Sequence, residues 1–308
     1  MSIRISVITP TYNRATVLYR VYESLKAQTY KDFEWIVIDD GSVDDTRTVV
    51  EEYIKENLFP IRYFYQENNG KHIALNEGCK KALGEMIVIA DSDDSFTGNA
   101  FEVMLKYWDE IPDEDKKNYR GITCRCYDPA DNSEIGFITN DKYLDLLGLD
   151  ATYKYKINFE MWGINRRDLM LKFPFPDIRR TDKGGLHFFP ETVIWDNMGR
   201  NYKVRYINEC LRAYYKDQDN ATTNVNNRRS QENIYLWEHL INDVLDYFWY
   251  SPMRFIKAFV GITMDGLLNG ESYFDIVKRG KNAARRVGIM MFSPFGFVLF
   301  LKHRKKCI

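Results

Sequence analysis

The sequence lacks the features that mark several protein classes. Five cysteines among 308 residues are an odd number on a long chain, which argues against a secreted disulfide framework. Cys124 and Cys126 have no second pair at metal-binding spacing, so no zinc site is expected. Because no basic stretch followed by a long apolar run opens the chain, no signal peptide is expected and the predicted location is cytoplasmic.

Long hydrophobic runs are also missing. No uninterrupted apolar run reaches the roughly 18 to 20 residues that a membrane-spanning helix needs, so no span is expected. The chain is nevertheless 45% hydrophobic and 15% aromatic, enough for a sizeable core. That composition excludes a disordered or collagen-like chain, and the length suits one large domain or two small ones.

Net charge is nearly absent, but its distribution is uneven. The formal charge of the whole chain is −1, whereas residues 1–277 carry −10 and residues 278–308 carry +9. The last segment holds nine Lys and Arg and no acidic residue. An acidic body makes a nucleic acid an unfavourable partner, because phosphate binding depends on clustered positive charge.

What the sequence does contain is an alternation of strands and helices. Short apolar runs predict buried strands, and apolar residues at helical spacing fill the intervals between them. The strands are predicted at residues 5–8, 33–38, 61–65 and 86–90. This order predicts an α/β fold with a mostly parallel central sheet flanked by helices, in which ligands bind beyond the carboxyl ends of the strands.

Three polar clusters follow predicted strands, at residues 9–13, 39–42 and 91–94. We expect them to converge on one crevice. The last cluster, Asp-Ser-Asp-Asp, places three carboxylates within four residues, and their repulsion is relieved well by Mg²⁺ or Mn²⁺. The alternative is a turn or an N-cap for the helix that follows. In the second cluster, Ser42 and Asp45 have capping-box spacing, which leaves Asp39 and Asp40 free for a base or ribose.

The combined motifs resemble glycosyltransferase family 2 over about residues 1–110. The matching segments, in order, are ISVITPTYN at 5–13, IDDGS at 38–42, Asn69-Gly70, ALNEG at 74–78, Gly84-Glu85 and DSDD at 91–94. The resemblance implies a GT-A fold and transfer of a sugar, with inversion, from a nucleoside diphosphate donor, with UDP the expected nucleotide and Mn²⁺ or Mg²⁺ the cofactor.

The resemblance also implies roles for individual residues. Thr11 and Tyr12 line the base pocket, Asp40 hydrogen-bonds the uracil with support from Asp39, and Asp93 is the main metal ligand. The full set expected to bind the nucleotide sugar is Pro10, Thr11, Tyr12, Asn13, Asp39, Asp40, Lys71, Asn76, Asp91 and Ser92, and the expected metal ligands are Asp91 and Asp93.

The second half of the chain carries fewer signals. Phe-Pro-Glu-Thr at 189–192 resembles the late acidic motif of the family, which implies that Glu191 is the general base, although Thr192 replaces the usual Asp. Asp182 and Asp196 are the alternatives for the base, and an acid after a proline also suits the first turn of a helix. Trp162 and Gly163 are predicted to line the acceptor site, with a core tryptophan as the other interpretation.

The C-terminal segment combines apolar and basic residues. Residues 287–301 are uncharged, contain Pro294 and Gly296, and are flanked by basic residues, which favours burial at a membrane interface over a span. Docking on the acidic body or on a second subunit is the alternative. The sequence therefore predicts a protein peripheral to the inner face of the cell membrane and leaves homodimer formation open.

The predicted organisation has three segments. Residues 1–110 bind the nucleotide sugar, 111–225 bind the acceptor within the same domain, and 226–308 form a helical extension. The predicted function is transfer of a hexosyl or N-acetylhexosaminyl group to a glycan or lipid-linked acceptor in cell-surface polysaccharide biosynthesis. The alternatives are a nucleotidyltransferase of related fold, which usually has an early Gly-rich loop that this chain lacks, and a non-catalytic sugar-nucleotide-binding scaffold.

Overall fold

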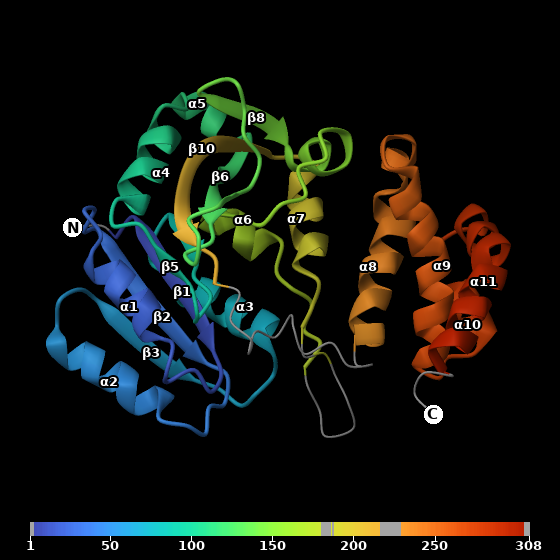
Figure 1. The fold of residues 1–308 in the computed structure, drawn as a ribbon, viewed down its shortest axis with the longest axis horizontal. Coiled ribbons are helices and arrows are strands. Elements are labelled where there is room, and N and C mark those ends of the chain that lie inside the picture. The colour runs from blue at the N-terminus through green and yellow to red at the C-terminus, as the bar shows by residue number, and fades with distance from the viewer. Residues whose placement is uncertain (1–2, 180–185, 187, 216–228, 305–308) are drawn as a thin grey trace. The chain divides into compact units, whose positions relative to one another are not determined.

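The computed structural model describes residues 3–179, 186, 188–215 and 229–304, which divide into two compact units. The first unit comprises Met1–Thr152, Lys156–His187 and Asn197–Asp217, and the second comprises Tyr153–Tyr155, Phe188–Asp196 and Gln218–Ile308. The first is built on a β-sheet and the second is helical (Figure 1).

The described residues form a ten-stranded sheet in the first unit. Eight strands follow the order β3-β2-β1-β4-β9-β6-β10-β5, while β7 pairs with β6 and β8 with β10. Strands β1 to β4 are parallel, and β9 runs antiparallel to both β4 and β6. The predicted α/β class is confirmed. The strands are β1 (Ile5–Thr11), β2 (Phe33–Asp39), β3 (Ile61–Tyr65), β4 (Met86–Ile89), β5 (Ser95–Phe96), β6 (Tyr119–Tyr127), β7 (Glu134–Ile135), β8 (Tyr143–Leu147), β9 (Met161–Arg166) and β10 (Lys203–Ala213).

Helices cover the central strands. Every residue of β1 and β2 is buried, as expected for parallel strands that are covered on both faces. Gly78 of α3 lies so close to Ile8 of β1 that a Cβ atom would approach the isoleucine side chain to 2.4 Å. The helices of this unit are α1 (Tyr19–Lys26), α2 (Thr46–Glu56), α3 (Lys71–Lys81), α4 (Ala100–Asp109), α5 (Asp113–Lys116) and α6 (Arg167–Lys172); α7 (Glu191–Gly199) lies mostly in the second unit.

The structure corrects two expectations about helix caps. Ser42 does not cap α2, since its hydroxyl accepts the backbone N–H of Asn13, and Asp44 instead accepts the N–H and hydroxyl of Thr46. The acidic cluster does not cap α4 either, because β5 intervenes and Asn99 occupies the N-cap position. Both clusters are thus free of the capping role that explains such residues elsewhere.

The second unit contains helices that approach closely through small residues. A Cβ atom on Gly261 of α9 would lie 2.7 Å from the Trp237 ring of α8, and one on Gly296 of α11 would lie 2.6 Å from Thr263. These contacts pack α9 against both neighbours. The helices are α8 (Arg229–Asp243), α9 (Pro252–Leu268), α10 (Tyr273–Lys278) and α11 (Ala283–Arg304), and a 3₁₀ turn covers Leu245–Tyr250.

Helix α11 corrects the prediction about spanning length. It runs for 22 residues and is long and apolar enough to cross a membrane, with 17% of its most apolar window buried. Pro294 does not end the helix. Proline lacks the N–H that would reach the carbonyl of Met290, and the Ser293 hydroxyl donates to that carbonyl instead (2.8 Å).

A buried polar network holds part of the second unit together. The carboxylate of Asp196 accepts the Tyr153 hydroxyl (2.6 Å) and faces His239 Nε2 (3.3 Å). On its other side, His239 Nδ1 lies 3.4 Å from Asp243, which also pairs with Lys281. Although burial lowers the pKa of His239, the two carboxylates outweigh it and raise that pKa above its ordinary value.

Candidate nucleotide-sugar site

The three polar clusters meet at the carboxyl ends of adjacent parallel strands. Thr11 pairs in register with Asp39, and the Asp40 N–H donates to the Thr11 carbonyl (2.8 Å). On the other side of β1, Ile8 pairs with Ile89, two residues before Asp91. The strand order reverses at β1, between β2 and β4, which is the position where open α/β sheets bind ligands.

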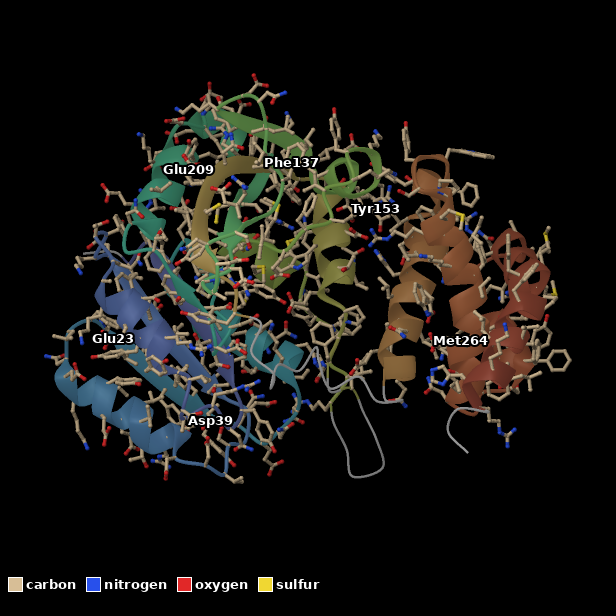
Figure 2. The ribbon with its side chains drawn as sticks, viewed as in Figure 1. Glu23, Asp39, Phe137, Tyr153, Glu209 and Met264 are labelled. Carbon is tan, nitrogen blue, oxygen red and sulfur yellow. The ribbon has the colours of Figure 1, made fainter. Side chains whose placement is uncertain are left out.

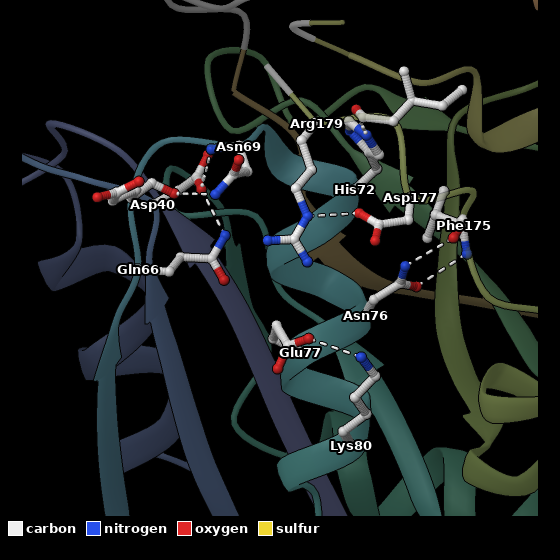
Figure 3. A network of polar contacts seen from close by, with 12 residues as sticks. Asp40, Gln66, Asn69, His72, Asn76, Glu77, Lys80, Phe175, Asp177 and Arg179 are labelled. Carbon is white, nitrogen blue, oxygen red and sulfur yellow. Dashed lines mark hydrogen bonds and ion pairs between the residues drawn. The ribbon is translucent and has the colours of Figure 1, made fainter. Parts of the chain in front are cut away.

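Asp39 and Asp40 are both buried and both hydrogen-bonded within the chain. Asp39, at the end of β2 (Figure 2), accepts the Ser42 N–H (2.8 Å) and the Tyr63 hydroxyl (2.6 Å). Asp40 accepts the Gln66 amide (2.7 Å) and the backbone N–H groups of Asn69 (2.9 Å) and Gly70 (2.8 Å), as Figure 3 shows in part.

These contacts limit what Asp40 can offer a ligand. Burial raises the pKa of Asp40, while the donors from Asn69, Gln66 and Gly70 act to lower it. A carboxylate has about four lone-pair sites, so three internal bonds leave one acceptor position. Asp40 therefore holds the loop at residues 66–70 in place. Its contact with a base remains a prediction, and that contact would use the one remaining acceptor position.

The segment after β1 contains one exposed ring and one unsatisfied hydroxyl. Tyr12 is 45% exposed, whereas Thr11 is buried and its hydroxyl has no hydrogen-bond partner within the described part of the chain. Asn13 has a positive φ of 52°, and its side chain accepts the Val43 N–H. Pro10 is a buried strand residue paired with Ile38. The buried Thr11 hydroxyl without a hydrogen-bond partner among the described residues, next to the exposed Tyr12 ring, suits a ligand that has both a polar group and a flat ring.

Lys71 extends from the start of α3 to the acidic cluster. Its ammonium lies 2.7 Å from Asp91. Gly70 precedes it with a φ of 96°, a conformation that glycine adopts without a steric penalty, and this turn directs the Gly70 N–H to Asp40. The Asn69-Gly70 turn thus connects the Asp40 and Asp91 clusters.

Arg212, near the end of β10, neutralises the other side of the acidic cluster. Its buried guanidinium lies 2.6 Å from Asp94, 3.7 Å from Asp91 and 2.8 Å from Glu160. Burial, together with the charges of Asp91 and Asp93, raises the pKa of Asp94 to about 8, against the lowering effect of Arg212. For Asp91 the burial effect is outweighed by Lys71 and Arg212, so its pKa is lowered.

Asp93 differs from its neighbours. Its carboxylate makes no hydrogen bond or ion pair to any residue that the structure describes, although its carbonyl accepts from Arg20 (3.1 Å). Ser92 beside it is buried. One open carboxylate next to a paired one suits a divalent ion that takes further ligands from bound phosphates. Consistently, the described residues hold no group of three or more side chains that could hold a metal by themselves.

Asn76 lies one turn further along α3 and is used within the chain. Its amide donates to the Phe175 carbonyl (2.8 Å) and accepts the Phe175 N–H (3.0 Å), as Figure 3 shows. His72 of the same helix contacts the Ile178 carbonyl (2.9 Å). Asn76 thus positions the segment around residue 175, and its predicted contact with ribose or diphosphate remains a prediction.

Trp162 and Gly163 occupy β9. Trp162 is 6% exposed, stacks on Phe96 at 5.0 Å and donates its indole N–H to the Ile89 carbonyl (2.7 Å). A Cβ atom on Gly163 would lie 1.9 Å from the Ile122 carbonyl, so glycine permits the close approach of β9 and β6. These contacts match the core interpretation of Trp162, and acceptor binding by the two residues remains a prediction.

Glu191 is the first residue of α7 and lies in the second unit. The helix therefore begins where the Pro-Glu pair predicts. Of the alternative bases, Asp196 is buried and engaged with Tyr153 and His239, while Asp182 lies outside the described residues.

Arg212, Glu160 and Gln66 are the site residues that the sequence analysis missed. Nothing local marks Arg212, which follows Leu211 near the end of a half-buried strand and reaches Asp94 only because β10 pairs with β5. The sequence offered one indication of Arg212: it is a charged residue at the apolar end of a strand, and a charged residue that is buried needs a partner.

Comparison with known proteins finds a family match. The model of "Glycosyl transferase family 2" matches residues 6–115. Over these residues, the chain is similar to glycosyl transferase family 2. The segment holding the Asp40 and Asp91 clusters lies within the matched residues.

Individual relatives match in sequence or in fold. The GalNAc(5)-diNAcBac-PP-undecaprenol beta-1,3-glucosyltransferase of Campylobacter jejuni is 36% identical over 105 residues, covering 33% of this chain and 34% of the relative. S. aureus TarS 1-349 in complex with UDP-GlcNAc superposes with a TM-score of 0.63 at 14% identity, covering 98% of this chain and 92% of TarS. The mannosyltransferase PcManGT of Pyrobaculum calidifontis, in complex with GDP-Man and Mn²⁺, has a TM-score of 0.50 at 18% identity over 99% of this chain and 81% of that one.

These matches establish the GT-A fold, as the sequence motifs implied. The sequence matches are partial, since the chain spans between 15% and 36% of the length of five curated relatives. The similarity to the family thus covers the N-terminal segment, whereas the similarity in fold covers nearly the whole chain.

Proposed function

We propose that this protein is an inverting glycosyltransferase that moves a sugar from a UDP-sugar to a glycan or lipid-linked acceptor. The observation that carries the proposal is the meeting, at one sheet edge, of an exposed ring at Tyr12 and an open carboxylate at Asp93. The family match and the UDP-GlcNAc complex of TarS support the donor class. The segments 1–110, 111–225 and 226–308 are proposed as donor-binding, acceptor-binding and extension segments.

The proposed cofactor is Mn²⁺ or Mg²⁺, held by Asp93 with Asp91 and by oxygens of the donor diphosphate. When bound, such an ion neutralises charge that develops on the leaving diphosphate. The Mn²⁺ complex of PcManGT supports this assignment. Asp91 is already paired with Lys71, so we propose that Asp93 contributes the larger share of the protein's affinity for the ion.

The chain's own residues carry the remaining steps. Tyr12 offers its ring to the base, the Thr11 hydroxyl and the free position of Asp40 offer hydrogen bonds, and Lys71 balances the diphosphate charge. In the transfer, the acceptor oxygen bonds to the anomeric carbon while the bond to the diphosphate breaks, and the diphosphate leaves with the electron pair. Glu191 takes the proton of the acceptor hydroxyl.

Thermal shift against nucleotides tests the donor class. We expect UDP to raise the melting temperature only when Mn²⁺ or Mg²⁺ is present, and to do so more than GDP, ADP or CDP. The matched control is Asp113→Asn, which removes an exposed carboxylate of the same unit and is expected to leave the shift unchanged. No shift with any nucleotide would favour a scaffold protein instead.

Glu191→Gln tests the base separately. We expect UDP-dependent stabilisation to persist while sugar transfer falls by about 10²-fold or more, because the variant keeps the shape of the side chain but cannot take the proton. Transfer at the wild-type rate by this variant would assign the base to another residue.

The acceptor and the location are proposed from α11 and one relative. The C. jejuni relative is named for an undecaprenol-linked acceptor, which suggests a lipid-linked glycan and a role in cell-surface polysaccharide biosynthesis. On α11, Ile289, Ser293 and Gly296 are buried against the unit, whereas Met291 and Phe295 on the opposite side are 68% and 63% exposed. Basic residues flank the helix at both ends, so we propose peripheral binding to anionic lipid at the inner face of the membrane.

Vesicle sedimentation tests this location without unfolding α11. Met291→Ser with Phe295→Ser is expected to abolish binding to vesicles containing phosphatidylglycerol and to leave the melting temperature unchanged. Val43→Ser with Leu58→Ser, which removes exposed apolar residues of the first unit, is the control. If the double variant of α11 still binds vesicles, the exposed face of α11 does not bind the membrane. If the wild type is a dimer that the double variant dissociates, this face binds a second copy of the chain.

A further inference from the structure

Glu160 is a carboxylate at the acidic edge that neither capping nor core packing explains. It directly precedes β9, which runs antiparallel to β4, so it lies across from the residues that follow β4. Arg212 Nη1 donates to Glu160 Oε1 at 2.8 Å, while Arg212 Nη2 lies 2.6 Å from Asp94. A single guanidinium thus links Glu160 to the cluster that contains Asp93.

Arg212 contacts two other carboxyl groups besides Glu160. Asp94, with a side chain 5% exposed, lies 2.6 Å from the guanidinium, and Asp91 lies 3.7 Å away. Glu160 is therefore the third carboxylate on one cation. It is also the most exposed of the three, with 43% of its side chain accessible.

Another arginine in the same sheet provides a comparison. Buried Arg125 of β6 pairs with exposed Glu134 of β7 at 2.6 Å, and no other carboxylate pairs with it among the described residues. In that pair the glutamate supplies the one counter-charge that the arginine needs. Arg212 already contacts Asp94 and Asp91, so Glu160 is an additional partner, and its more exposed side chain remains accessible to a ligand.

We propose that Glu160 binds hydroxyl groups of the donor sugar and so contributes to the choice of sugar, with Arg212 as the residue that positions it. Glu160 Oε1 is held by Arg212, and Oε2 has no partner within the described residues. A carboxylate fixed at one oxygen is a strong acceptor for neutral hydroxyls at the other. Arg212 connects Glu160 to Asp94, which follows Asp93 in the chain, so the sugar of a donor whose diphosphate is at Asp93 is proposed to lie beside Glu160. This inference rests on the proposed function.

Binding measurements without an acceptor test the assignment. The dissociation constants of UDP and of four UDP-sugars (glucose, galactose, GlcNAc and GalNAc) are measured with Mn²⁺ for the wild type, Glu160→Gln and Glu160→Ala. We expect the preferred UDP-sugar to bind about tenfold or more weakly to both variants, while the affinity for UDP stays within about twofold. Glu160→Gln keeps an oxygen that accepts from Arg212, which maintains the fold if Glu160→Ala does not.

The matched control is Glu134→Gln, which alters an arginine pair that includes none of Asp91, Asp94 and Arg212, and it is expected to change neither constant. An equal loss of affinity for UDP and UDP-sugar, or no loss for either, overturns the role of Glu160 while the proposed donor class stands. A wild type that binds neither UDP nor any UDP-sugar overturns the proposed function itself and this inference with it.

Discussion

The carboxylates of the two units differ in how completely they are satisfied. In the second unit, Asp196 is closed by Tyr153 and His239. In the first unit, Asp91 and Asp94 are paired with cations, but Asp93 between them has no side-chain partner within the residues described. The comparison teaches that a cluster of acids points to a ligand only where its members are held in place and one of them is left open.

The largest expected effect comes from removing the open carboxylate. Asp93→Asn is expected to lower metal-dependent sugar transfer by about 10²- to 10³-fold, because the variant loses the charge that holds the ion. The melting temperature should stay near that of the wild type, since the side chain makes no hydrogen bond or ion pair within the described residues that the change could remove. Transfer is measured by UDP release with Mn²⁺. A variant that is unstable and not merely inactive would show that Asp93 is structural, as Asp196 is.

Asp196→Asn is expected to show the opposite pattern. Breaking a buried hydrogen-bonded pair leaves His239 facing a weaker acceptor, which should lower the free energy of unfolding by about 3 kcal/mol. Urea denaturation followed by fluorescence measures it. The dissociation constant of UDP should be unchanged, and a loss of UDP affinity without loss of stability would remove the contrast between the two clusters.

Asp40→Asn is expected to affect both stability and UDP binding, unlike the changes at Asp93 and Asp196. Its three internal hydrogen bonds predict a loss of about 2 kcal/mol in the free energy of unfolding, because an amide accepts through one oxygen and its NH₂ faces N–H donors. Weaker UDP binding should accompany this loss if the remaining acceptor position contacts the base. Loss of stability with unaltered UDP affinity would restrict Asp40 to shaping the 66–70 loop.

The smallest effect is a pair of opposed pH dependences. Burial lowers the pKa of His72 in the first unit, so its contribution to stability is full above pH 6.5 and is lost as the pH falls from 6.5 through the lower pKa of the folded state. The raised pKa of His239 in the second unit gives a contribution that is full below pH 6.5 and is lost as the pH rises through the folded value.

Each contribution is expected to be small beside the effects described above. Urea denaturation between pH 5 and pH 9 measures each contribution, because this range brackets the ordinary histidine pKa of about 6.5. His72→Gln should reduce the fall in stability at low pH, and His239→Gln should reduce the fall at high pH. Two variants that reduce the fall at the same end of the pH range would contradict the assigned directions.

Much of the donor side was predictable because its signals are local. The strand at residues 61–65 appears at its predicted bounds, and the clusters at 9–13, 39–42 and 91–94 follow strands as expected. By contrast, the capping role predicted for Ser42 was wrong, because the hydroxyl found a partner in Asn13 across a neighbouring loop. Helix α11 continues through Pro294, and the Ser293 hydroxyl satisfies the carbonyl that proline leaves unbonded, which the sequence pattern did not indicate.

The sequence by itself determined the α/β alternation, the family and the edge of the sheet at which the acidic clusters gather, because apolar periodicity and strand-end position are properties of nearby residues. Only the tertiary structure decided which carboxylates are open. Arg212 neutralises Asp94 and holds Glu160 because β10 pairs with β5 and β9 pairs with β4, and strand pairing joins residues that are far apart along the chain. The charge of a site is set by such pairings, so it is read from the fold and not from the motif.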